Sequence, residues 1–474
     1  MSLSRQIAKQ TTVQVVGRLA SLFLGVWAIF LMTRYLGPAQ FGYYTIAIAF
    51  MQIAGILVDF GLYNLVLQIP KGEPEKETKI FNNIFTIRIF SAILFYGLAI
   101  FVGFLFPYPL IVKLAIAISA IAFFGNTMIQ IFTAHFQKLL QMRWPVIAEI
   151  TNRTILVAGL FFIVKNNLGF YALMWLLAIV ALINLLVLFL VAFFEKEQKI
   201  KLAFDVAIWK DVLRQAWPIG LAIALNLIYF KADTLILSLY YSASDVGFYG
   251  ASYRVLEILM TFPLMFIGLI VPFLSKSWLE GNRENFERYL QKAFDFLVLV
   301  SIPMALGTYV LADRLMIFVA GPEFLAAGRI LKIIIFAAGI IFVSQLFTHT
   351  LFAIRKQRLM LWFYLFTAVV ALIAYFIFIP LYSYWAAAII TLISELIIFA
   401  SAYLIVARTA KIKLKWRVVY LSFLASCFMA LIIYLFHGLN LFLLIILGIL
   451  VYAVVVYLIG GVDKKLIHSL LKLK

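Results

Sequence analysis

The sequence carries little charge and a single cysteine. Only 12% of its 474 residues are charged, whereas 66% are hydrophobic and the mean hydropathy is +1.09. A water-soluble globule of this length cannot bury so much apolar surface, so a soluble fold is excluded. Cys427 lies in an apolar run, and as the lone cysteine it excludes an intrachain disulfide and a cysteine-based metal cluster.

Sequence motifs that bind nucleotides or metals are also missing. The chain contains no glycine-rich phosphate-binding loop, no metal-ligand spacing and no nucleophile elbow. We therefore expect no cofactor and no metal, and we do not expect an enzyme.

Acidic residues are scarce as well. The 20 Asp and Glu residues face 39 Lys and Arg residues, which gives a net charge of +19. In a soluble chain this excess would suggest nucleic acid, because clustered cations neutralise phosphates. In a membrane protein the excess belongs on cytoplasmic loops, where it sets the topology. We expect contacts with membrane lipids and no nucleic-acid partner.

Long apolar runs dominate what is present. They reach about 20 residues or more, which is the length of a membrane-spanning helix, and they lack the alternation of a barrel wall. The sequence therefore predicts an all-α integral membrane protein with about fourteen transmembrane helices. The expected spans are 13–33, 41–66, 80–106, 110–135, 145–165, 169–194, 212–240, 247–274, 292–312, 328–353, 359–379, 384–407, 418–436 and 440–460.

The basic residues predict the orientation of these spans. The first run, 13–33, is too long for the apolar part of a cleavable signal peptide, so it is expected to remain as the first span. If the N-terminus is cytoplasmic, most Lys and Arg residues fall on the inner loops, as the positive-inside rule requires. We predict a multi-pass protein of the cytoplasmic (inner) membrane with both termini in the cytoplasm.

An internal repeat is visible in two short matches. Phe41-Gly-Tyr-Tyr44 aligns with Val246-Gly-Phe-Tyr249, and Gln130-Ile-Phe-Thr133 aligns with Gln345-Leu-Phe-Thr348 at a similar offset. Both matches join equivalent spans six apart. They predict two six-helix halves that enter the membrane in the same sense and can rock against each other.

Three segments carry a resemblance to a known family. They are Thr33-Arg-Tyr-Leu-Gly-Pro-Ala-Gln-Phe-Gly-Tyr-Tyr44, the stretch from Trp217-Pro218 through Ala232-Asp-Thr234 to Asp245-Val-Gly-Phe-Tyr249 and Tyr253-Arg254, and the turn Gly321-Pro-Glu-Phe324. This pattern resembles the polysaccharide transporter branch of the flippase superfamily that also contains the MATE drug exporters and the lipid II flippases. The resemblance runs from about residue 11 to residue 417, and the last two spans carry no motif.

The resemblance implies a MATE-like pair of six-helix lobes around a central cavity lined by spans 1, 2, 7 and 8. It implies transport of a polyprenyl-pyrophosphate-linked oligosaccharide across the cytoplasmic membrane by alternating access, with other polysaccharide assembly proteins as further partners. The expected divisions are an N-lobe at 1–200, a C-lobe at 201–410, and two trailing helices with a cytoplasmic tail at 411–474. The resemblance does not identify the sugar, because members of this branch share a fold more than a substrate.

Ionisable residues within the predicted spans are candidate functional residues, because charge facing lipid is costly. Five are basic (Arg18, Arg88, Arg153, Lys231 and Arg254) and five are acidic (Asp59, Glu149, Asp233, Glu257 and Glu395). Two pairs, Glu149 with Arg153 and Arg254 with Glu257, lie one helical turn apart and can pair locally.

The depth of the other charges suggests two layers in the central cavity. Arg18, Asp59 and Arg88 lie toward the cytoplasmic ends of their spans, whereas Lys231, Asp233 and Arg254 lie toward the outer ends. Our hypothesis is that the cations of the two layers hold the pyrophosphate in turn. Asp59 and Asp233 would position the cations or carry a coupling cation, and Glu395 is a candidate titrating carboxylate.

Two other functions stay open at this point. A MATE-like exporter of cations or drugs would favour a cavity dominated by acidic residues, whereas the basic residues within the predicted spans are as numerous as the acidic ones. A membrane-bound polysaccharide polymerase or ligase would need a sizeable outer loop with catalytic residues, and the longest outer break, 313–327, is short and largely apolar.

Overall fold

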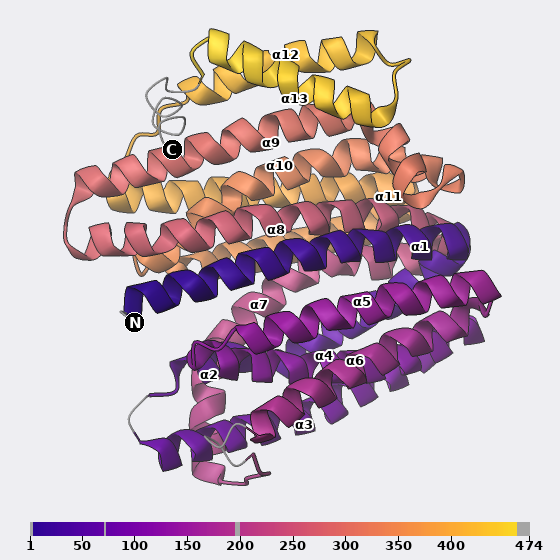
Figure 1. Ribbon diagram of the computed structural model, residues 1–474, viewed down its shortest axis with the longest axis vertical. Coiled ribbons are helices and arrows are strands. Elements are labelled where there is room, and N and C mark those ends of the chain that lie inside the picture. Colours follow the sequence, from indigo (N-terminus) through magenta and orange to yellow (C-terminus); the bar gives the residue numbers. More distant parts are fainter. Residues whose placement is uncertain (1–2, 71–72, 195–199, 462–474) are drawn as a thin grey trace. The chain divides into compact units, whose positions relative to one another are not determined.

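The computed structural model describes residues 3–70, 73–194 and 200–461, and every regular element in these ranges is a helix (Figure 1). The all-α fold is confirmed. The helices are α1 (Leu3–Asp59), α2 (Leu62–Gln68), α3 (Pro74–Leu105), α4 (Leu110–Lys138), α5 (Arg143–Asn166), α6 (Gly169–Phe194), α7 (Val206–Tyr240), α8 (Ala243–Leu279), α9 (Arg283–Ala320), a 3-10 turn η1 (Pro322–Phe324), α10 (Leu325–Ala353), α11 (Gln357–Ala410), α12 (Arg417–Leu435) and α13 (Leu441–Leu458).

Twelve of the described helical segments are long and apolar enough to cross a membrane. Two of them, Gly17–Gln68 and Gln357–Ala410, have 52 and 54 residues, which is more than twice the length of one crossing. Each contains a residue with non-helical backbone angles, Gly37 (φ 64°) in α1 and Ser383 (φ 55°) in α11. Helices α1 and α11 are therefore each two helices joined at a kink, and the count of fourteen spans stays a prediction.

Side-chain hydrogen bonds cap the N-termini of several of these helices, at positions where a polar segment interrupts the apolar runs. The side chain of Asp205 accepts hydrogen bonds from the backbone N–H groups of Ala207 and Ile208 at the start of α7. Asn282 and Asn440 cap α9 and α13 in the same way. Such caps satisfy backbone donors that have no partner within the helix. The predicted spans agree with the observed helices to within a few residues at most ends.

The helices form two compact units, Met1–Gly247 and Phe248–Lys474. In the first unit, α1 packs on α4, α5 and α7, and α6 packs on α4 and α5 (Figure 1). In the second unit, α10 packs on α9 and α11, and α12 packs on α9 and α13. The units divide after Gly247, near the start of α8, whereas the predicted lobes divide at residue 200. The predicted lobes stay a prediction, and the tail 462–474 lies outside the described residues.

The connector that leads into α7 is bound to α3. The backbone N–H groups of residues 201, 203 and 205 donate to the side chains of Asn82, Thr86 and Asn83 at 3.3, 2.9 and 2.9 Å. The Trp209 indole also donates to the Asn83 oxygen, at 3.0 Å, and Lys79 forms an ion pair with Asp205 at 2.6 Å. Alternate residues of an extended segment thus use side chains of α3 as acceptors, which places the start of α7 against α3.

The two segments of the first sequence repeat meet in the structure. A β-carbon added to Gly42 would come within 1.7 Å of the Ala243 carbonyl oxygen, and one added to Gly247 would come within 2.0 Å of the Pro38 carbonyl oxygen. Ala243 and Gly247 follow Pro38 and Gly42 by the same offset of 205 residues. Reciprocal contacts of this kind are typical of twofold-related surfaces. The aligned glycines therefore occupy equivalent positions.

Candidate functional site

A polar chamber of about 620 Å³ lies within the first unit. Its volume is in the range of small-molecule sites, about 300–1,000 Å³. Helices α1, α3, α4, α5, α6 and α7 line it, and most of its polar side chains come from α1, α4 and α5. These polar lining residues are Gln52, Asp59, Tyr96, Asn126, Thr127, Gln130, Thr133, Glu149, Asn152, Arg153 and Asn184.

A break in the second predicted span positions Asp59 at this chamber. Helix α1 ends at Asp59, and α2 begins at Leu62 after Phe60 (φ 36°) and Gly61 (φ 89°). The Asp59 carboxylate accepts hydrogen bonds from the backbone N–H groups of Gly61 at 3.4 Å and Tyr63 at 3.2 Å. A positive φ at residue 61 suits glycine, because other residues adopt it only with strain. The carboxylate thus stabilises the break that places it there.

Arg88 is the main partner of Asp59. Its side chain is 0% exposed, it forms an ion pair with Asp59, and its second terminal nitrogen donates to Gln130 at 2.7 Å. Removing one member of a buried ion pair costs about 3–5 kcal/mol, because the other charge stays buried without compensation. The structure brings these two predicted residues together, and it uses the Arg88 guanidinium to neutralise Asp59 beside the chamber.

Glu149 and Arg153 both line the chamber from α5. Among the described residues no ion pair joins them, so the local pairing that their spacing suggested is absent. The Arg153 Nε and the Oδ1 atoms of Asn152 and Asn184 are buried and have no hydrogen-bond partner in the described part of the chain. The Asn184 side chain is 7% exposed. Polar groups of several kinds thus converge on the chamber with unused hydrogen-bonding capacity.

The other predicted residues lie outside the chamber lining. Arg18 on α1 is exposed, and both it and Asp59 act electrostatically on Tyr63. On α7, Lys231 is buried and Asp233 is 0% exposed, and Asp233 accepts hydrogen bonds from the backbone N–H and hydroxyl of Thr234 at 2.5 and 3.1 Å.

The remaining two predicted residues belong to the second unit. Arg254 on α8 forms an ion pair with Glu257 at 2.6 Å, which confirms the pairing suggested by their spacing. Glu395 on α11 is buried near Tyr364, on whose hydroxyl its charge acts. Neither contact tests a role in transport.

The sequence reasoning missed the amides of the chamber. It ranked charged residues only, whereas Gln52, Asn126, Asn152 and Asn184 also lie within membrane-spanning helices. Amides in apolar spans are a usable signal, because a polar group in lipid needs a partner or water. Asn126, Gln130 and Thr133 follow one another at helical spacing on α4, and that spacing predicts one shared face.

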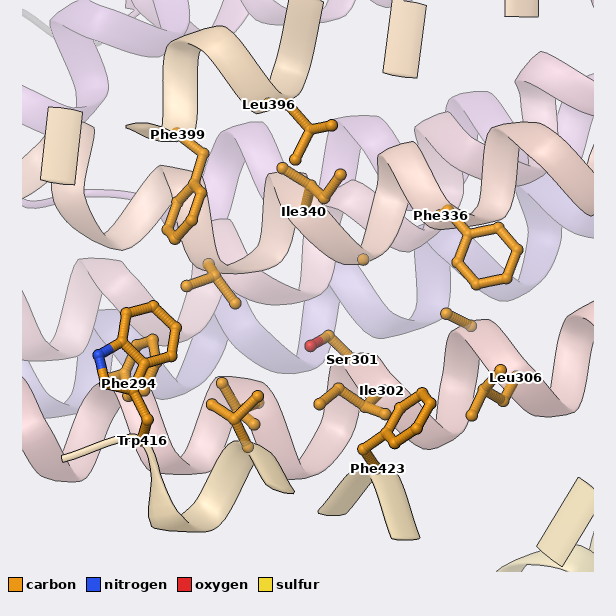
Figure 2. Close-up of a pocket in the computed structure, with 15 residues that line it drawn as sticks. Phe294, Ser301, Ile302, Leu306, Phe336, Ile340, Leu396, Phe399, Trp416 and Phe423 are labelled. Carbon is orange, nitrogen blue, oxygen red and sulfur yellow. The ribbon is translucent and has the colours of Figure 1, made fainter. Parts of the chain in front are cut away.

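The second unit contains a groove of the opposite chemistry, of about 280 Å³. Figure 2 shows aromatic and aliphatic side chains from α9, α10, α11 and the start of α12 around it, among them Phe294, Ile340 and Phe399. Among the lining residues only the Ser301 hydroxyl and the Trp416 indole are polar side-chain groups. The groove can take a hydrocarbon chain and offers little to a charged group.

The polysaccharide biosynthesis protein family matches residues 7–278, which is more than half of the chain. The chain belongs to this family. The MatE family also matches, over residues 218–377. As a member of the polysaccharide biosynthesis protein family, the chain falls in the flippase superfamily indicated by the sequence resemblance. No curated protein matches it in sequence.

Solved structures of flippases and transporters share the fold of this family member. The lipid II flippase MurJ in an inward closed conformation has a TM-score of 0.74 and 17% identity, and the match covers 94% of this chain and 98% of that one. A multidrug resistance MATE family transporter in an inward-facing conformation has a TM-score of 0.63 and 13% identity, with 85% and 96% covered. The eukaryotic MATE transporter AtDTX14 has a TM-score of 0.63 and 15% identity, with 86% and 98% covered.

Proposed function

We propose that this protein is a flippase that moves a polyprenyl-pyrophosphate-linked oligosaccharide across the cytoplasmic membrane by alternating access. The family match and the shared fold support a transporter of the flippase superfamily. The observation that carries the finer proposal is the polar chamber of balanced charge inside an otherwise apolar bundle. A hydrophilic headgroup needs polar surface within the membrane, because lipid cannot replace its hydration.

Cations in the spans are the proposed contacts for the pyrophosphate. Arg18 is the strongest candidate, because its side chain is exposed within a membrane-spanning segment, where a guanidinium has to face water or a polar group. Lys231 and Arg254 are proposed to contact the same group at other stages of the transport cycle. Arg88 is a weaker candidate than the sequence suggested, because Asp59 and Gln130 already bind its terminal nitrogens.

The setting of the protein follows from this function. The polyprenyl chain would stay in the bilayer, and other polysaccharide assembly proteins would supply and consume the substrate on the two sides. Both termini are proposed to face the cytoplasm. Asp59 and Glu395 remain proposed sites for a coupling ion, and Asp59 can serve only if the ion displaces Arg88.

The alternative function is export of a cation or drug in the manner of the MATE transporters. It is supported by the MatE match and by the MATE structures that share the fold. The chamber argues against it, because the two acids Asp59 and Glu149 are matched by Arg88 and Arg153. A site with no excess of negative charge has little attraction for a cation.

A reconstituted transport assay tests the proposal. The purified protein is placed in liposomes with a fluorescent polyprenyl-pyrophosphate oligosaccharide, and flipping is measured as the fraction reached by a membrane-impermeant quencher. Parallel liposomes report efflux of a dye cation. We expect protein-dependent flipping of the glycolipid and no dye efflux. Dye efflux without glycolipid flipping would establish the exporter instead.

Single substitutions test the proposed cations in the same assay. Arg18→Ala, Lys231→Ala and Arg254→Ala are each expected to abolish flipping at unchanged folding. Lys165→Ala is the matched control, because Lys165 is an exposed cation at the end of α5. Full flipping by all three variants would show that these cations do not bind the pyrophosphate.

A further inference from the structure

Six side chains that line the chamber have no hydrogen bond or ion pair within the described part of the chain: Gln52, Asn126, Glu149, Asn152, Arg153 and Asn184. Other polar side chains of the chamber do have partners. Asp59 is paired with Arg88, and the hydroxyls of Tyr96 and Thr127 lie 2.7 Å apart. A polar group shielded from water without a partner costs about 1–3 kcal/mol. Asn152, Arg153 and Asn184 each hold a buried polar atom of this kind, whereas Asn126 and Glu149 are exposed at the chamber. Unpaired polar groups gathered around one cavity therefore call for water or a polar ligand rather than a structural role.

Close helix packing brings two of these amides to the chamber wall. A β-carbon at Gly125 on α4 would lie 3.2 Å from the backbone and side chain of Ala181 on α6. The side chains of Asn126 and Asn184 come one residue and three residues after this crossing, and both line the chamber. Asn184 is the more informative of the two, because it is more than nine-tenths buried and its Oδ1 atom has no partner in the described residues.

The chemistry of the six groups distinguishes between classes of ligand. Each amide offers one acceptor and a double donor, Glu149 only accepts, and Arg153 only donates. A metal or alkali cation would need oxygen ligands converging on one point. A phosphate would need donors alone. A ligand rich in hydroxyl groups fits the mixed set, because every hydroxyl both donates and accepts. The opposite charges of Glu149 and Arg153 leave the six groups without net charge.

We infer that this chamber is a recognition site for uncharged saccharide, which binds sugar hydroxyls through the amides of Asn126, Asn152 and Asn184 and through Glu149 and Arg153. The inference rests on the proposed flippase function and divides its substrate between two sets of residues. The cations of the spans take the pyrophosphate, and the chamber takes the glycan. The chamber would then determine which lipid-linked sugars are carried.

Two substrates that differ only in the sugar test this division. One is a polyprenyl pyrophosphate that carries a neutral trisaccharide, chosen from a panel built of hexose and N-acetylhexosamine. The other is the same carrier without sugar. Asn184→Leu and Asn126→Leu each replace an amide side chain of the chamber with an apolar side chain of similar volume. Each is expected to reduce affinity for the trisaccharide lipid about 10-fold to 100-fold, the size expected when one buried polar group loses its hydrogen-bond partner. Affinity for the bare carrier is expected to stay unchanged.

Thr133→Val is the matched control. Thr133 lines the same chamber, but its hydroxyl is bonded to the Ile129 carbonyl oxygen within its own helix, at 2.8 Å. Its replacement is therefore expected to leave both affinities unchanged. The melting temperature of each variant in detergent reports folding, and Asn126→Leu keeps the test valid if Asn184→Leu does not fold, because the Asn126 side chain is exposed.

Binding of the free trisaccharides, measured by calorimetry, separates this inference from the proposed function. Saturable binding to the wild type that is weakened in the leucine variants supports the chamber as a saccharide site. Equal loss of both lipids in the variants, or no loss of either, overturns it, as does the absence of binding by every free sugar in the panel. If the wild type binds free sugar but flips neither lipid, the flippase function fails while the saccharide site stands.

Discussion

The reciprocal contact between the repeat segments predicts a large effect from a very small change. Gly42→Ala and Gly247→Ala each add one methyl group. That methyl group would lie 1.7 Å from the Ala243 carbonyl oxygen in the first variant and 2.0 Å from the Pro38 carbonyl oxygen in the second. A β-carbon essentially never lies closer than 3.0 Å to a heavy atom outside its own neighbourhood in the chain. The obstacles are backbone atoms, so no rotamer change can make room.

The magnitude follows from the required displacement. The helices would have to separate locally by more than about 1 Å, and overpacking of this kind typically costs about 1–3 kcal/mol. Because one separation makes room for both methyl groups, the double variant is expected to lose less stability than the sum of the single variants. We also expect loss of flipping, because both glycines lie in the aligned segments of the sequence repeat, and the predicted halves that carry these segments are expected to move against each other.

The assay is thermal unfolding in detergent combined with the glycolipid flipping assay. Gly97→Ala and Gly268→Ala are matched controls, because a β-carbon at either position meets nothing within 4 Å. Alanine there is expected to be neutral or slightly stabilising, because alanine favours helix more than glycine does. The reasoning is refuted if Gly42→Ala melts and transports like Gly97→Ala, or if the two single destabilisations simply add.

Three further predictions concern the first unit. Arg88→Met should lower stability by about 3–5 kcal/mol because Asp59 stays charged and unpaired, and adding Asp59→Asn should recover most of the loss in thermal unfolding. Asn83→Ala removes an acceptor shared by the connector and an indole, so connector amides should exchange hydrogen faster by mass spectrometry. The pKa of Asp205 is lowered, mainly by the bond to Lys79 and next by a backbone N–H of α7. The ionised Asp205 side chain therefore stabilises the connector above pH ~4, and this stabilisation is lost as the pH falls through the lowered pKa. The exchange difference between wild type and Asp205→Asn should disappear over that acidic range.

The sequence predicted the helices well, because a span is determined locally by a run of apolar residues. The expected span 169–194 coincides with α6, and the expected span 110–135 ends three residues before α4 does. The break in the expected span 41–66 was missed. The Asp59 carboxylate stabilises that break together with close packing from α7, where a β-carbon at Gly220 would lie 2.7 Å from the Phe60 carbonyl oxygen. Residues about 160 positions apart cannot signal such packing through periodicity.

The site was predicted only in part, for a related reason. Hydropathy identifies a charge within a span but not the partner that the fold gives it. Arg88 and Asp59 were placed in one layer, but their pairing depends on α1 meeting α3. Amides such as Asn184 gave no signal in an analysis based on charge. Their importance follows from their shared position around one cavity, which only the packing of α4, α5 and α6 creates.

The pairing of Asp59 also bears on the choice between flippase and exporter. A coupling cation or a proton at Asp59 would have to displace a guanidinium that is fully buried and held by a second partner, Gln130. Displacement would leave Arg88 charged and uncompensated, at a cost comparable to breaking the pair. The Asp59 carboxylate is therefore better suited to holding the helix break and Arg88 than to exchanging ions in every cycle. Since this exchange is what an acidic exporter site requires, the pair favours a chamber that recognises its ligand by hydrogen bonds.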